Sequence, residues 1–214
     1  MRTLLVLLIS AGLTAPLLAQ GGGAPRYAPP QPMPPSRAED SYAIYSMLLR
    51  SGPIEWRDAK RTQWLIEDTT TAMPLDSACR PTSGKNLMNP HNGVIPPVDR
   101  QAEWNELLAD FDRHCHDVIQ LDRDSFRTRL PVRLLNAEER RIFRTNVLSP
   151  PAEFADGAGL HSFTEVFFNA SHSLALVEEG MWCGDLCGNW SWVVLERKGS
   201  RWELLPWVRG SLMS

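Results

Sequence analysis

The sequence lacks the short motifs that mark the common catalytic sites. It contains no Gly-x-Ser-x-Gly, no His-Glu-x-x-His and no phosphate-binding loop. Glu178 and Glu179 are adjacent in a strand-like run, and neighbouring side chains of a strand point to opposite faces, so the two cannot act as a carboxylate pair. Residues 171–173, Ser-His-Ser, have the composition of a turn. We therefore predict no catalytic residue, no cofactor and no metal.

The sequence also lacks an excess of positive charge and any long apolar run after its N-terminus. Its formal net charge is −3 at pH 7, whereas nucleic-acid-binding proteins usually carry a basic face. No later segment approaches the roughly 18 unbroken apolar residues that a membrane-spanning helix requires. We expect a protein that binds no nucleic acid and has no membrane span after cleavage of a signal peptide.

The N-terminus contains the pattern of a secretory signal peptide. Arg2 precedes an apolar run over residues 4–13, and Ala19 supplies the small residue before a cleavage site. We predict a signal peptide over residues 1–19, a Pro- and Gly-rich linker over 20–37 and a single domain over 38–214. The protein is then exported, and it is either periplasmic or secreted.

Three segments have the spacing of helices. Ser36 and Glu39 are spaced as a capping box for a helix over residues 36–51. Residues 99–121 repeat apolar side chains every three or four positions, which predicts a second helix. Asn136 and Glu139 form a capping box for a third helix, which runs to about residue 147. A strand-like run, residues 62–71, follows the first helix, and a Pro-rich loop over 72–98 follows that strand.

The C-terminal quarter has the composition of strands. After a short predicted strand at residues 132–135, four further runs are separated by short turn signals. Short turns join antiparallel neighbours, so these runs predict a four-stranded antiparallel meander. With the N-terminal helices packed on that sheet, the fold class is α+β. The four runs are residues 163–168, 173–181, 189–197 and 201–208.

Cys183 and Cys187 lie on either side of the Gly184-Asp185-Leu186 turn between two of these runs. Opposed residues of a hairpin lie about 4.5 Å apart between Cα atoms, and a disulfide accepts about 4.4–6.8 Å. Export places the pair in an oxidising compartment, which favours a cross-hairpin disulfide. A thioredoxin-like redox centre is the less favoured alternative, because it needs Cys-x-x-Cys at a helix N-terminus. A second alternative is a zinc site that adds Cys115 and the histidines at 114 and 116.

The remaining cysteines are Cys79 and Cys115, in the long loop and the central predicted helix. Four cysteines allow three connectivities. If Cys183 pairs with Cys187, then Cys79 pairs with Cys115 and ties the loop to the helix. Two free thiols are the alternative, with Cys115 buried in the core.

Five of the eight tryptophans fall in the last 33 residues. Indole rings stack on sugars and peptides and are favoured anchors of interfaces, so these residues are a candidate binding surface. The alternative is that a small sheet fills its core with large side chains. The five are Trp182, Trp190, Trp192, Trp202 and Trp207.

The C-terminal pattern resembles that of a family of uncharacterised exported bacterial proteins. In that family a strand ending in Phe-Asn precedes a turn, an Ala-Leu-Val strand, a Cys-Gly-x-Leu-Cys-Gly segment and a strand that closes with Leu-Glu-x-Lys-x-Gly-x-Trp. This chain departs from the family where Asn189-Trp190 replaces small residues. The resemblance implies export and a shared α+β domain, and it implies no activity. Its counterparts here are Phe168-Asn169, residues 175–177, 183–188 and 195–202, together with WLIEDTT at 64–70 and LNAEERRIF at 135–143.

Two functions are compatible with these observations. The first is an exported, non-catalytic binding or structural domain of the cell envelope, which contacts a glycan or a protein partner through the tryptophan-rich sheet or the long loop. The second is a small hydrolase- or isomerase-like enzyme with a pocket between sheet and helices. In the second, His161, Glu165 or His172 acts as the acid or base, and a buried carboxylate of raised pKa beside a deep pocket would favour it.

Overall fold

The computed structural model describes residues 24–51, 62–81, 86, 88–146, 151–154, 157, 159–184, 187–208, 212 and 213. The predicted signal peptide lies outside this set. Within it, no helix is both long and apolar enough to cross a membrane.

The described strands form one mixed sheet of eight strands and a separate two-stranded pair. The order in the large sheet is β10-β8-β7-β5-β2-β4, with β6 paired to β7 and β9 paired to β8. The strands of this sheet are β2 (Trp64–Glu67), β4 (Val132–Leu135), β5 (Leu160–Phe163), β6 (Phe167–Phe168), β7 (Leu174–Gly184), β8 (Cys187–Lys198), β9 (Arg201–Leu205) and β10 (Leu212–Met213).

The predicted α+β class is confirmed, but the four-stranded meander is only part of the sheet. β6, β7, β8 and β9 pair with their neighbours in antiparallel fashion, as expected from the short turns. The run over residues 163–168 is divided between β5 and β6, and both pair with β7. β2 lies between β4 and β5 and is parallel to both, so the sheet extends beyond the C-terminal quarter. Parallel strands are joined by long connections, so the sequence contains no short turn from which this pairing could be predicted.

The helices are α1 (Pro35–Ser51), α2 (Pro90–Gly93), α3 (Gln101–His114) and α4 (Ala137–Thr145). α1, α3 and α4 lie close to where the sequence places helices, whereas α2 lies in the stretch predicted as a loop. The capping box at Asn136 is confirmed, because its side chain accepts from the Glu139 N–H and Glu139 accepts from the Asn136 N–H. The box at Ser36 is wrong, since α1 already begins at Pro35, a residue suited to a first helical position. α3 ends before residue 121, and the chain turns into β3 (Ile119–Gln120).

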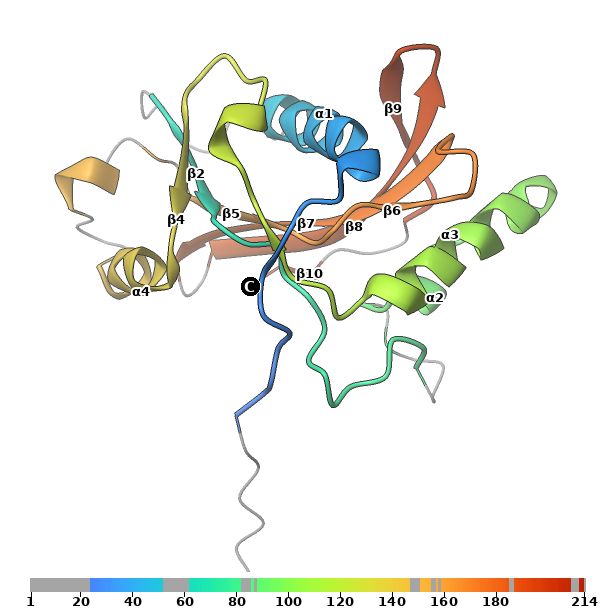
Figure 1. Ribbon diagram of the computed structural model, residues 1–214, viewed down its shortest axis with the longest axis horizontal. Helices are drawn as coiled ribbons and strands as arrows, with labels where there is room; N and C mark the ends of the chain where they lie inside the picture. The colour runs from blue at the N-terminus through green and yellow to red at the C-terminus, as the bar shows by residue number, and fades with distance from the viewer. Residues whose placement is uncertain are drawn as a thin grey trace, which may run out of the picture.

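The sheet is covered on both faces. Figure 1 shows α1 on one side of the sheet and α4 on the other. Alternate residues of β7 belong to different clusters: Val177 packs with α1, whereas Leu176 packs with α3. Farther along β7, Trp182 packs against the cluster that contains Phe143 of α4. The core is thus divided by the sheet, with α1 over one face and α3 and α4 over the other.

Part of the predicted linker is attached to the domain. β1 (Gln31–Pro32) pairs in parallel with β3. The Arg26 carbonyl accepts a hydrogen bond from the Leu75 N–H at 2.8 Å. The chain that leads into α1 therefore runs along the folded part, which fixes the direction from which α1 starts.

Candidate functional site

The four cysteines form two disulfides. Cys79 is bonded to Cys115 across a sequence separation of 36, and Cys183 is bonded to Cys187 across the β7–β8 connection. The Cα atoms of the pairs lie 5.9 and 5.0 Å apart. The predicted cross-hairpin disulfide is confirmed. The zinc alternative loses its thiolate ligands, because each sulfur is bonded to another sulfur. The first disulfide holds the loop after β2 against the end of α3.

Most of the tryptophan-rich surface lies in the core. Trp192, Trp202 and Trp207 are buried, and Trp192 also donates to the Met88 carbonyl at 2.7 Å. Trp182 and Trp190 are partly exposed. The ring of Trp190 lies over Gly180, where an added Cβ would come within 2.4 Å of the indole. Filling of the core, the alternative reading, accounts for three of the five side chains.

The three candidate acids or bases occupy different environments. His161 is buried on β5, with its ring 5.2 Å from that of Trp64. His172 lies in the β6–β7 turn, stacked on Phe168 at 4.5 Å with parallel planes. Glu165 is buried just before β6. Of the three, only His172 lines the pocket described next.

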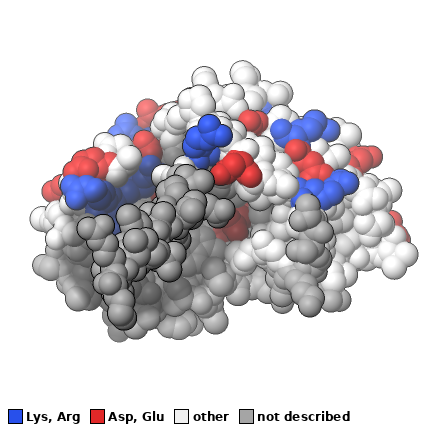
Figure 2. Space-filling model, turned by 90° about the horizontal axis from the view of Figure 1, so that it is seen from below, with Lys and Arg blue, Asp and Glu red and all other residues white. Residues whose placement is uncertain are grey.

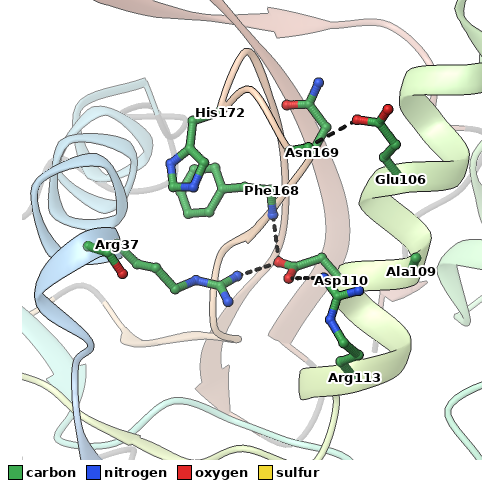
Figure 3. A pocket seen from close by; sticks show the side chains of 10 residues that line it. Arg37, Glu106, Ala109, Asp110, Arg113, Phe168, Asn169 and His172 are labelled. Atoms are coloured by element: carbon green, nitrogen blue, oxygen red, sulfur yellow. Dashed lines mark hydrogen bonds and ion pairs between the residues drawn. The ribbon is translucent and has the colours of Figure 1, made fainter.

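A pocket of about 410 Å³ opens where the start of α1, the outer side of α3 and the β6–β7 turn meet. Figure 3 shows Arg37 reaching across from α1 toward Asp110 on α3, with His172 and Phe168 between the two helices. Phe168, Ala109 and Ala170 contribute apolar surface. The remaining lining residues are Ser36, Arg37, Glu106, Asp110, Arg113, Asn169 and His172.

Asp110 joins the three walls of this pocket. Its Oδ2 accepts from Arg37 at 2.5 Å and from the Phe168 N–H at 2.9 Å. Its Oδ1 accepts from Arg113, one turn along α3, at 3.0 Å. The side chain is almost fully buried, and burying a carboxylate without such partners would be costly. Asp110 thus connects α1, α3 and β6 through a single carboxylate (Figure 3).

Glu165 lies behind Arg37. The Nε atom of Arg37 is 3.2 Å from Oε1 of Glu165, and its Nη2 donates to the Val166 carbonyl at 2.8 Å. Glu165 is only 2% exposed, and its Oε2 has no hydrogen-bond partner among the described residues. Burial raises the pKa of Glu165 to about 7, although the charges of Arg37 and His114 lower it. Such a carboxyl exchanges its proton near neutral pH, which is a property of catalytic acids.

Hydrogen bonds of the Asn169 side chain close the β6–β7 turn, which forms one wall of the pocket. Asn169 accepts from the N–H groups of Ser173 and Leu174, both at 2.9 Å, and its amide donates to the hydroxyl of Ser171. His172 has a φ of +52°, a left-handed conformation that the turn enforces. This hydrogen-bonded turn carries Asn169 and His172, which line the pocket.

Sequence reasoning did not single out Arg37 or Asp110. The two lie 73 positions apart, and neither belongs to a motif. The sequence did contain one sign that Asp110 is buried. It lies between Leu107 and Phe111 on the apolar side of α3. A charged residue in an apolar stripe requires a buried partner, but the stripe does not say which residue supplies it.

A second feature is the pair of adjacent glutamates on β7. Alternation from Leu176 and Val177 places Glu178 on the face covered by α3 and α4, and Glu179 on the face covered by α1. Burial raises the pKa of each to about 7. Their placement on opposite faces agrees with the prediction that they form no carboxylate pair.

Replacing Glu178 by glutamine is expected to stabilise the protein at pH 8, by up to about 3 kcal/mol. The folded protein keeps the Glu178 proton to about pH 7, whereas the unfolded chain releases it near 4.5. The unfolded state therefore binds fewer protons over this range, and wild-type stability falls as the pH rises. Urea unfolding at pH 4.5 and pH 8 measures the effect, with the exposed Glu203→Gln as the control. An equal effect of the Glu178 variant at both pH values would contradict this account.

The visible surface carries mixed charges. Figure 2 shows Lys and Arg atoms interspersed with Asp and Glu atoms on this side of the described part, without a broad patch of one sign.

No family model, no curated protein and no solved structure matches this chain. The resemblance of the C-terminal quarter to exported bacterial proteins therefore stays a prediction.

Proposed function

We propose that this protein is an exported, non-catalytic binding domain of the cell envelope, in the family that its C-terminal pattern resembles. The pocket between α1, α3 and the β6–β7 turn is its binding site. Two disulfides within one domain support export, because disulfides persist in oxidising compartments. The N-terminal pattern of an apolar run and a small residue before residue 20 supports it as well.

The observation that carries this proposal is that the polar side chains around the pocket are already paired with one another. Asp110 forms ion pairs with Arg37 and Arg113, and Asp40 lies 3.3 Å from a ring nitrogen of His172. These pairs fix donors in place before any ligand arrives, which lowers the entropy cost of binding. The pocket is thus suited to recognise a group rather than to transform it.

The ligand group that fits this site is a carboxylate next to an apolar surface. Arg113 is 63% exposed, so most of its guanidinium remains accessible although one nitrogen donates to Asp110. Guanidinium groups bind carboxylates through paired N–H donors. Phe168 and Ala109 supply the adjacent apolar wall. Acidic sugars and peptide C-termini of envelope polymers carry both features.

Replacing Arg113 by alanine is expected to weaken binding of such a ligand about tenfold or more, since a hydrogen bond to a charged group contributes about 1.5–3 kcal/mol. Calorimetry with a panel of peptidoglycan fragments and acidic oligosaccharides measures this. Arg123→Ala is the matched control, because Arg123 is equally exposed but pairs with Asp124 outside the pocket. Wild-type protein that binds nothing in the panel, or equal losses in both variants, would count against the proposal.

A hydrolase- or isomerase-like activity is the second candidate, and the buried carboxyl of Glu165 favours it. Arg37 stands between Glu165 and the pocket, so a substrate would have to displace the Arg37–Glu165 contact. Turnover of a chromogenic ester or glycoside by the wild type, lost in Glu165→Gln, would replace the binding proposal with this one.

A further inference from the structure

We propose that His114, Asp117 and Glu165 form a binding site for a divalent transition-metal ion of the zinc class. The site lies next to the pocket but shares no lining residue with it. The metal site therefore goes beyond the proposed binding function, and the two can be tested independently of each other.

The fold brings the three ligands together from two segments. His114 is the last residue of α3, and the turn that follows returns Asp117 to it through a hydrogen bond from the Asp117 N–H to the His114 carbonyl at 2.9 Å. Glu165 approaches from the segment between β5 and β6. One ring nitrogen and one oxygen of each carboxylate lie within 4.8 Å of one another. Ligand atoms around a tetrahedral zinc are about 3.4 Å apart. Nδ1 of His114 and Oδ2 of Asp117 are hydrogen-bonded at 2.7 Å, so an ion would replace that hydrogen bond and these two atoms would move slightly apart.

The unpaired oxygen of Glu165 is an independent sign of a missing ligand. Only 2% of Glu165 is exposed to solvent, yet its Oε2 has no hydrogen-bond partner among the described residues. A buried carboxylate oxygen without a partner is costly. A cation held between Glu165, His114 and Asp117 supplies that partner.

The surroundings suit an ion that enters from solvent. The side chains of His114 and Asp117 are 34% and 32% exposed, so the mouth of the site is open while Glu165 forms its floor. Three protein ligands then leave a coordination position for water or a bound group. Asp110 lies at the other end of the imidazole, with Oδ1 3.7 Å from Nε2 of His114.

The ligand set selects the class of metal. One imidazole with two carboxylates suits zinc and its neighbours, whereas calcium and magnesium prefer oxygen ligands alone. Among the described residues, a second cluster with ligand spacing is Cys79, Cys115 and His116. It offers no thiolate, since its two sulfurs form a disulfide.

Titration of the purified, metal-free mature protein with zinc chloride tests this proposal, with cobalt(II) absorbance as a spectroscopic readout. We expect one ion per chain, and at least a tenfold loss of affinity in Glu165→Gln and in Asp117→Asn. His91→Ala is the control, because His91 also faces a carboxylate, Asp112 at 2.7 Å, and belongs to no three-ligand cluster within the described part of the chain. This variant should bind as the wild type does.

Two results would overturn the proposal. One is the absence of stoichiometric zinc or cobalt binding by the wild type. The other is unchanged binding by both ligand variants. Circular dichroism of each variant shows whether it is folded, and His114→Ala is a third ligand variant should Glu165→Gln fail to fold. Glycan or peptide binding through Arg113 is measured separately, so a failure of one proposal leaves the other standing.

Discussion

Replacing Asp110 by alanine is expected to lower the free energy of unfolding by about 3–5 kcal/mol, the usual cost of removing one partner from a buried ion pair. The variant leaves Arg37 beside Glu165 without its main counter-charge. It also removes the acceptor of the Phe168 N–H, which is a buried hydrogen bond. Both losses act at the contact of α1, α3 and β6, so the effect should extend over the whole domain.

The matched control for this prediction is Asp124→Ala. Asp124 also pairs with an arginine, Arg123 at 3.1 Å, but both side chains are exposed. Exposed pairs contribute about 0–1 kcal/mol, so this variant should be close to the wild type. Chemical denaturation with disulfides intact measures both variants. Equal and small losses of stability in both variants would show that the contacts of Asp110 do not hold α1, α3 and β6 together.

Removing the Cys79–Cys115 disulfide by a double alanine substitution is expected to cost about 4 kcal/mol. The bond spans a sequence separation of 36 and joins the loop after β2 to the end of α3. Its loss allows the unfolded chain many more conformations. The same substitution at Cys183 and Cys187 removes a separation of only 4, and the expected cost is about 2 kcal/mol.

Urea unfolding of the two double variants measures this difference. The intact mass of the wild type after alkylation without reductant must first show that no thiol is free. The prediction concerns the order of the two effects as well as their size. A larger loss at Cys183–Cys187 would mean that fixing the β7–β8 turn matters more than closing the long loop.

Local patterns in the sequence predicted the local structure well. The capping box at Asn136 and the apolar spacing before His114 indicated α4 and α3, since both depend on contacts within a few residues. The short turns between β7, β8 and β9 indicated antiparallel pairing, and the same reasoning predicted the Cys183–Cys187 disulfide. The opposite placement of Glu178 and Glu179 followed from the alternation of a strand.

Only the tertiary structure decided the rest, because it depends on residues far apart in the chain. The parallel placement of β2 between β4 and β5 leaves no short turn signal in the sequence. Arg37 meets Asp110 across 73 positions, and Glu165 joins them from a third segment. Burial of three tryptophans depends on which helices cover the sheet. The sequence by itself determined the approximate places of α1, α3 and α4 and the antiparallel turns of the C-terminal strands. The packing of distant segments determined the pocket and the Arg37–Glu165 contact beside it.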